Sequence, residues 1–232
     1  MDHDARFSRF RTGSEATAVS TGCVDVSATS ESFRSAFRIA QEWYMRTDGA
    51  FTPYPPTGGL DLDGVVKALA MRAAGGFLDR CGMPTWCLDA GGDVLVRSSP
   101  SGPGWVIGIV DPREHGGLLA RVRLDGHHLR ALATSGTAER GEHIWRVPGA
   151  EEVIQASVLS ADIVAADVLA TAVVAGGRAT MRHVVAEESA RGCPVEALRV
   201  VGACGELGLA GTPGFAGLTA CASPGHRAVI PE

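Results

Sequence analysis

The sequence of 232 residues is poor in lysine, in paired cysteines and in long apolar runs. Lys67 is the only lysine among 21 basic residues, and a formal net charge of −5 offers no basic surface for nucleic acid or anionic lipid. The six cysteines form no C-x-x-C pair, so zinc-ribbon and thioredoxin spacings are absent, and we expect small buried thiols in a reducing cytoplasm. With no run of 18 apolar residues and no secretory signal, we predict a cytoplasmic protein with no membrane partner.

What is present is ordinary globular composition, with 45% hydrophobic and 20% charged residues. The length suits one large domain, and we predict a single domain over residues 1–232. Apolar residues recur at helical spacing in four segments, residues 30–47, 62–81, 161–176 and 178–191. The expected buried stripe of the first helix, which Ser30 caps, is Phe33, Phe37, Ala40 and Tyr44, with Trp43 beside it. In the second helix it is Leu62, Val65, Val66, Leu69, Ala73 and Phe77.

Strand signals fill most of the region between the second and third helices. Residues 86–88 and 94–96 flank a tight glycine turn, and residues 105–110, 118–124 and 129–134 are predicted to be further strands of a meander. We also expect a closing hairpin at 197–203 and 206–212, a loop at 52–59, and short helical, loop and strand material over 1–28. Because helices and antiparallel strands alternate irregularly, the predicted class is α+β.

Asp167 and Thr171 are four residues apart, so on a helix both side chains lie on one face. A carboxylate and a hydroxyl are hard oxygen ligands, and Mg²⁺ takes one or two protein carboxylates while water and phosphate supply the rest. The surrounding alanines, valines and leucines predict a buried helix, in which an acid needs a partner. Alone, the pair fits an ordinary solvated helix face at least as well as a metal site.

Two glycine-containing segments offer places where a ligand can approach the backbone. The segment 61–67, DLDGVVK, puts two acids at a helix start, where they suit the helix dipole, and Lys67 follows Gly64 by about one turn. The segment 89–93, DAGGD, predicts a tight turn that a flat or anionic ligand can approach. Alone, these patterns are typical of a charged helix cap and a plain hairpin turn.

A run of small hydroxyl residues from Thr134 to Thr137 leads to His143, a candidate general acid or base near neutral pH. A satisfied structural histidine is the commoner case. The sequence has no G-x-S-x-G elbow and no H-E-x-x-H motif, so it gives no support to serine-hydrolase or zinc-protease chemistry.

Taken in order, these segments resemble the ApbE family, the FAD:protein FMN transferases. The matching strings are FSRFR (7–11), TDGAF (47–51), DLDGVVK (61–67), DAGGDV (89–94), ATSGTAERGEHI (133–144), ADVLATA (166–172) and GELGLAGTPGF (205–215). These strings cover nearly the whole chain. The chain looks most like the short, actinobacterial-type members of the ApbE family. The resemblance implies one T-fold-like α+β domain with an antiparallel sheet and packed helices, shortened at its N-terminus and without the first strand.

The resemblance also implies that the protein binds FAD with Mg²⁺, cleaves the FAD pyrophosphate, and passes FMN to a Ser or Thr hydroxyl of an acceptor flavoprotein, releasing AMP. Gly64, through its carbonyl, Asp167 and Thr171 match the metal ligands, and His143 matches the catalytic histidine that takes the proton of the acceptor hydroxyl. The predicted cofactor-binding residues are Phe10, Ala50, Phe51, Thr52, Asp61, Lys67, Gly91, Gly92, Asp93, Ser135 and Ile144.

Two other functions use the same motifs. One is an FAD diphosphatase, in which water replaces the acceptor hydroxyl and FMN and AMP are released. The other is a flavin-binding member without catalysis, suggested by Thr52 and Arg146, which stand where the family usually has other residues. The sequence leaves this choice open, together with the identity of the acceptor and any homo-oligomer.

Overall fold

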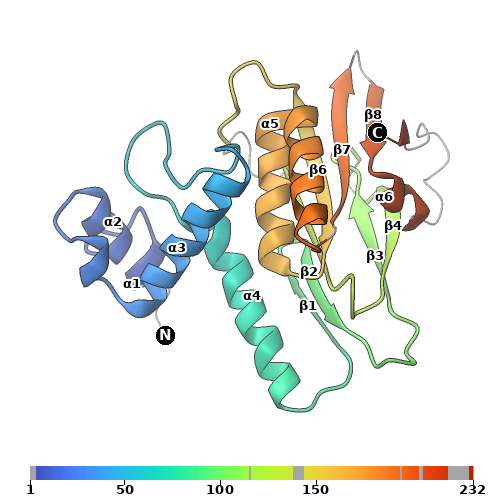
Figure 1. Cartoon of the computed structure of the whole chain (residues 1–232), viewed down its shortest axis with the longest axis horizontal. Coiled ribbons are helices and arrows are strands. Elements are labelled where there is room, and N and C mark those ends of the chain that lie inside the picture. Colours follow the sequence, from blue (N-terminus) through green and yellow to red (C-terminus); the bar gives the residue numbers. More distant parts are fainter. Residues whose placement is uncertain are drawn as a thin grey trace.

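A computed structural model describes residues 4–114, 116–137, 144–193, 195–203, 206–218 and 230–231. Helices combine with a mostly antiparallel sheet, which confirms the predicted α+β class. Figure 1 shows a layered molecule, in which helices cover one face of the main sheet and a small second sheet lies against the other face.

The first 30 residues form short helical turns. They are α1 (Asp4–Phe7), α2 (Glu15–Ser20) and the 3-10 turn η1 (Val26–Ala28). Local side-chain caps favour these turns, because Ser14 accepts from a backbone N–H of α2 and Asp25 does the same for η1. No strand occurs within residues 4–30, so the strand material predicted there is wrong.

Helices α3 (Glu31–Arg46) and α4 (Asp63–Arg80) occupy two of the predicted segments, and Ser30 caps α3 as expected. The predicted stripes are only partly right. The residues buried within these helices are Phe33, Ala36, Ala40 and Trp43 in α3, and Val65, Ala68, Met71 and Gly75 in α4. Phe77 is 60% exposed, whereas the nearby Gly75 is buried. At Gly75 the helix lies close to Trp86, since a Cβ there would be 2.7 Å from the Trp86 ring.

The main sheet has the strand order β1-β2-β5-β6-β7-β8-β9, and all neighbours are antiparallel except β8 and β9. Its strands are β1 (Trp86–Ala90), β2 (Asp93–Arg97), β5 (Ala131–Gly136), β6 (Val153–Ser160), β7 (Glu196–Ala203), β8 (Glu206–Gly211) and β9 (Ile230–Pro231). The glycine turn between β1 and β2 and the β7–β8 hairpin confirm two predictions. Strand β6 lies at the centre of the sheet and was not among the predicted strands.

The predicted meander is correct for one pair of strands only. Strands β3 (Trp105–Val110) and β4 (Leu118–Leu124) pair with each other in a separate two-stranded sheet. Strand β5 does not follow β4 into that sheet but lies between β2 and β6. Alternating polarity indicates which face of a strand is buried but does not identify the neighbouring strands. The sequence pattern therefore could not predict that β5 pairs with β2 and β6.

Helix α5 (Ile163–Ala190) packs on β5, β6 and β7. Gly177 interrupts it with φ 68° and ψ −152°, a conformation that favours glycine, so two helices meet there and the predicted pair 161–176 and 178–191 is confirmed. By length and composition α5 is apolar enough to cross a membrane, but 78% of its most apolar window is buried within the fold. This burial is what a core helix shows.

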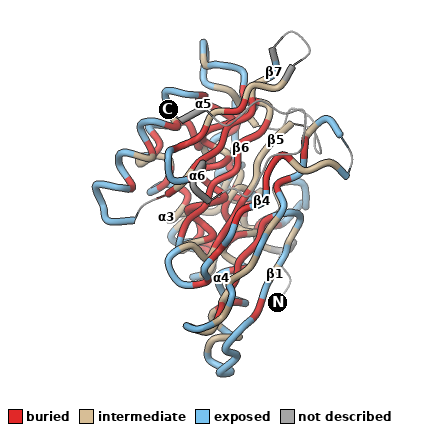
Figure 2. The backbone as a smooth tube through the Cα atoms, turned by 90° about the vertical axis from the view of Figure 1, so that its right-hand side faces the viewer, coloured by how far each residue is buried: buried red, intermediate tan, exposed pale blue. Residues whose placement is uncertain are grey.

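Two apolar cores lie on opposite faces of the main sheet. The first joins the sheet to α3, α4 and α5 and includes Phe33, Leu62, Val65, Val164 and Leu169. The second lies under β3, β4 and α6 (Pro213–Leu218) and includes Ile109, Leu119, Val122, Leu132 and Phe215. Figure 2 shows buried backbone along α5, β4 and β6 and exposed backbone at the tip below α4.

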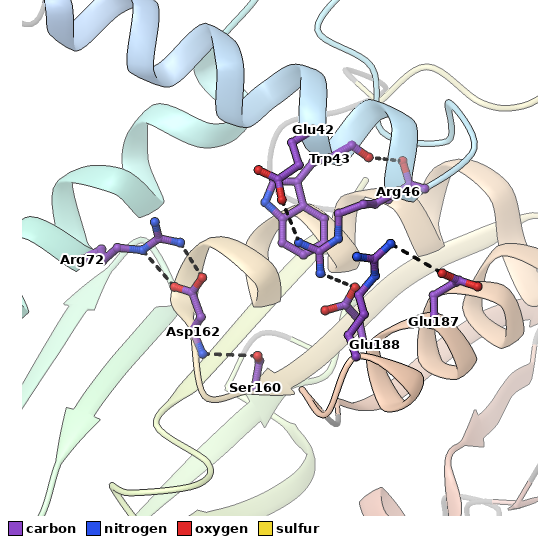
Figure 3. Close-up of polar contacts among 10 residues, drawn as sticks. Glu42, Trp43, Arg46, Arg72, Ser160, Asp162, Glu187 and Glu188 are labelled. Atoms are coloured by element: carbon purple, nitrogen blue, oxygen red, sulfur yellow. Dashed lines mark hydrogen bonds and ion pairs between the residues drawn. The ribbon is translucent and has the colours of Figure 1, made fainter.

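Ion pairs join the helices at the edge of the first core (Figure 3). The Arg46 guanidinium lies 3.9 Å from the centre of the Trp43 ring and pairs with the buried Glu188 of α5. Arg72 of α4 pairs with Asp162, the N-cap of α5. Both contacts hold α5, the helix that carries two of the predicted metal ligands.

The cysteines differ from expectation. Cys23, Cys81, Cys87 and Cys193 are exposed free thiols, so the prediction of buried thiols is wrong for these four. Cys23, Cys81 and Cys193 come shortly after the ends of α2, α4 and α5, where the chain turns at the surface. Cys204 and Cys221 lie outside the described residues.

Candidate active site

Lys67 lies between two carboxylates where α4, β2 and α5 meet. Its Nζ pairs with Asp93 and lies 3.8 Å from Asp167 Oδ2. Both carboxylates are buried, whereas the Lys67 side chain is 34% exposed. The structure thus brings together residues from three separate motifs, and the side chain of the only lysine remains partly exposed.

Asp93 is the first residue of β2, directly after the Gly91–Gly92 turn. One carboxylate oxygen accepts a hydrogen bond of 3.1 Å from the backbone N of Thr134 on β5, and the other oxygen faces Lys67. Burial raises the pKa of Asp93 above its ordinary value, although the Lys67 charge and both hydrogen bonds oppose this shift. The sequence places Asp93 among the cofactor contacts, but the structure buries it completely against Lys67.

Asp167 and Thr171 lie one turn apart on α5, in the arrangement predicted from their spacing. Asp167 is buried, and the Thr171 hydroxyl lies 3.0 Å from Ser135 Oγ on β5. Ser135, predicted as a cofactor contact, therefore holds a predicted metal ligand in place.

This set of donors suits a divalent cation that prefers hard oxygen. Mg²⁺ retains water and phosphate oxygens, so one carboxylate, one hydroxyl and a backbone carbonyl are enough protein ligands. Within the described residues no three His, Cys, Asp or Glu side chains cluster in a way that would hold a metal. The Lys67 ammonium, 3.8 Å from Asp167, adds a positive charge that suits a bound phosphate rather than the metal itself. The residues present fit a metal site that a phosphate-containing ligand completes.

Gly64, in the first turn of α4, lies close against Phe51. A Cβ at this position would be 2.8 Å from Phe51 Cε2, so a larger residue would displace the ring. Ala50 and Phe51 are both buried in the first core, and Phe51 lies next to Gly64. Thr52 accepts a hydrogen bond from the backbone N of Tyr54 in a local turn.

Asp61 precedes α4 and pairs with Arg9 at 3.0 Å. The Arg9 guanidinium lies 4.7 Å from the centre of the Phe10 ring, and Phe10 is 79% exposed. Arg9 therefore connects two predicted cofactor contacts that are far apart in sequence. Arg9 was not among the predicted site residues. The feature of the sequence that could have indicated it is its position next to Phe10 in the FSRFR string.

The other predicted residues lie around this centre. Gly91 and Gly92 form the exposed turn next to Asp93, with φ of 64° and 86°. Ile144 is partly buried and packs against the first core. His143, the predicted catalytic residue, lies outside the described residues.

The fold and these motifs agree with one known family. The model of the ApbE family matches residues 54–194. This is more than half of the chain, and the chain therefore belongs to the ApbE family. No curated protein sequence matches it.

Solved structures share the fold. The flavin transferase ApbE from Vibrio cholerae is 17% identical with a TM-score of 0.71, and the match covers 93% of this chain and 86% of that one. The flavinyl transferase ApbE from Pseudomonas stutzeri, in its apo form, is 17% identical with a TM-score of 0.70, covering 95% and 85%. The ApbE protein of Thermotoga maritima is 22% identical with a TM-score of 0.63, covering 84% and 81%. These likenesses confirm the predicted ApbE-like fold.

Proposed function

We propose that this member of the ApbE family is an FAD:protein FMN transferase. Flavin transfer is the activity named for the Vibrio cholerae and Pseudomonas stutzeri proteins that share its fold. The observation that carries the proposal is Lys67 between Asp93 and Asp167, with Thr171 one turn along the same helix as Asp167. A cation and hard oxygen donors in one site suit a substrate that contains a pyrophosphate.

In this proposal Asp167, Thr171 and the carbonyl of Gly64 hold Mg²⁺, which when bound neutralises charge on the pyrophosphate. In this proposal the partly exposed Lys67 side chain offers its ammonium to a phosphate oxygen. Phe10 offers an exposed ring on which a flavin or adenine ring can stack.

The proposed reaction exchanges one phosphorus–oxygen bond for another. The hydroxyl oxygen of a Ser or Thr on the acceptor flavoprotein attacks the phosphorus of the FMN half of FAD. The bond from that phosphorus to the bridging oxygen breaks, and AMP leaves with the bridging oxygen. His143 accepts the proton of the attacking hydroxyl. With water in place of the acceptor, the same exchange releases free FMN and AMP.

The test is incubation of the purified chain with FAD and Mg²⁺, with and without EDTA and with and without a candidate acceptor flavoprotein. FAD, FMN and AMP are then separated, and the acceptor band is imaged for flavin fluorescence. We expect metal-dependent AMP release and a fluorescent acceptor. FMN and AMP in the absence of acceptor would identify a diphosphatase instead, and bound but intact FAD in every mixture would identify a flavin-binding protein without catalysis.

Two variants test the assigned roles. Asp167→Asn is expected to lose the metal-dependent turnover. His143→Ala is expected to lower turnover while FAD binding is largely kept. Asp79→Asn is the control, because Asp79 lies about 18 Å further along α4 than Lys67, at 1.5 Å per residue. Equal loss of FAD binding in the first two variants would contradict this division of roles.

A further inference from the structure

Asp93 is a buried carboxylate with no exposed surface of its own. It is fully buried, and both of its oxygens are engaged, one by the backbone N of Thr134 and the other by Lys67. Its partners belong to β5 and α4, two elements of the first core. The position of this carboxylate is therefore set by the fold.

We propose that Asp93 is a positioning residue that keeps the Lys67 ammonium off Asp167, so that Asp167 serves a divalent cation while Lys67 serves the pyrophosphate. This inference rests on the proposed function. It assigns no contact between Asp93 and FAD or the metal, and Asp93 acts through Lys67 alone.

The charges of the site carry the argument. Lys67 contacts Asp93 but is 3.8 Å from Asp167, so one ammonium lies between two buried carboxylates and is closer to Asp93. If the carboxylate of Asp93 were neutral, the nearest remaining carboxylate for the ammonium would be Asp167. A lysine paired there would compete with the metal, since two cations repel each other at such distances. Asp93 prevents this competition by providing a second carboxylate on the β2 side.

The first test compares Mn²⁺ binding by electron paramagnetic resonance, with Mn²⁺ alone and with saturating FAD. Asp93→Asn keeps the shape of the side chain and removes its charge. We expect Mn²⁺ to bind about tenfold more weakly, the lower end of the losses found when residues behind the ligands of a metal are changed. In the double variant Asp93→Asn/Lys67→Met the competing ammonium is gone, and we expect Mn²⁺ affinity to return to about the wild-type value. A purely structural role of Asp93 predicts no such recovery.

Asp79→Asn is the matched control, because it also removes a carboxylate that pairs with a basic side chain, at the other end of α4. It should bind Mn²⁺ as the wild type does. Unchanged Mn²⁺ affinity in Asp93→Asn, or no recovery in the double variant, would overturn the positioning role. Failure of the metal site in the proposed function has a different result, since the wild type itself would then not bind Mn²⁺.

A second readout needs no variant. Because Lys67 is the only lysine, growth on ¹³C,¹⁵N-lysine labels one residue of the chain. If Asp93 holds the ammonium, addition of Mg²⁺ alone should move the Cε and Nζ resonances only slightly, and they should remain distinct from those of free lysine. A Lys67 signal that becomes that of a freely solvated lysine when Mg²⁺ is added would contradict the inference even if Asp93→Asn failed to fold.

Discussion

Ser135 Oγ and Thr171 Oγ1 lie 3.0 Å apart, so a hydrogen bond joins β5 to α5 at the candidate site. Thr134, the preceding residue of β5, gives its backbone N–H to Asp93, and its hydroxyl lies 2.8 Å from Ser157 Oγ on β6. The contact with Asp93 uses the backbone of Thr134, whereas the contact with Thr171 uses the side chain of Ser135. Two neighbouring residues of β5 thus fix both a predicted metal ligand and the carboxylate that holds Lys67.

Thr171→Val and Ser135→Ala separate the ligand from the residue that orients it. Thr171→Val removes the hydroxyl with little change of shape, and we expect the Mg²⁺ concentration for half-maximal FAD cleavage to rise at least about tenfold. Ser135→Ala removes only the orienting hydrogen bond, so its increase should be smaller. Each variant should lose no more than about 1.5 kcal/mol in free energy of unfolding, the net value of one hydrogen bond. An unchanged Mg²⁺ dependence in Thr171→Val would remove Thr171 from the metal site.

Gly64→Ala tests the close approach of α4 to Phe51. Alanine favours a helix over glycine by about 1 kcal/mol, but a Cβ 2.8 Å from the Phe51 ring adds a packing penalty of about 1–3 kcal/mol. We expect net destabilisation of about 1 kcal/mol and weaker FAD binding, because the ring moves. The control is Gly76→Ala on the same helix, where the nearest atom is the end of the flexible Arg80 side chain at 3.5 Å. Gly76→Ala should stabilise the fold and leave FAD binding unchanged, and identical behaviour of the two variants would refute the prediction.

Asp79 makes the fold sensitive to acid. Desolvation by burial raises the pKa of Asp79, but hydrogen bonds from Arg97 and Trp86 and the charges of Arg97 and Arg130 outweigh it, so its pKa lies below the ordinary value. A carboxyl with a lower pKa in the folded chain stabilises the fold above its unfolded value of about 3.9, and this contribution is lost as pH falls through the folded value.

The corresponding measurement is urea unfolding of wild type and Asp79→Asn between about pH 6 and pH 2.5, on either side of the ordinary carboxyl range. We expect the wild type to be more stable at the upper end and the difference between the two proteins to shrink as pH falls. A difference that stays constant over this range would show that Asp79 has the same pKa in the folded and unfolded chain.

The elements that could be predicted are those whose local signal is strong. Ser30 and the apolar spacing after it set α3, and the two glycines after Ala90 set the β1–β2 turn. The two helical segments around Gly177 were also separable, because glycine there adopts a φ of 68°. Strand β6 and the place of β5 were missed, because pairing between distant strands depends on the packing of two cores and leaves no local pattern.

The site was predictable as a set of residues and less so as a geometry. The helical spacing of Asp167 and Thr171 was enough to place both on one face. That Lys67 joins Asp93 to Asp167, and that Ser135 holds Thr171, depends on how β2, β5 and α5 meet, which no single motif encodes. Arg9 was missed because an arginine beside an aromatic residue on a short N-terminal segment looks like an ordinary surface residue.

Breaking the Arg46–Glu188 pair is expected to destabilise the packing of α3 on α5, because it leaves a charge without its buried partner (Figure 3). Glu188→Gln leaves Arg46 partly buried, with its side chain 18% exposed, and among the described residues only the exposed Glu42 then remains as a carboxylate partner. We expect a loss of about 3 kcal/mol in free energy of unfolding, at the lower end for a broken buried pair. The control is Glu187→Gln, because Glu187 pairs with Arg191 at 3.7 Å on the surface, where a pair contributes less than about 1 kcal/mol. Urea unfolding of both variants decides the matter, since equal losses would show that burial of Glu188 gives the Arg46 pair no special strength.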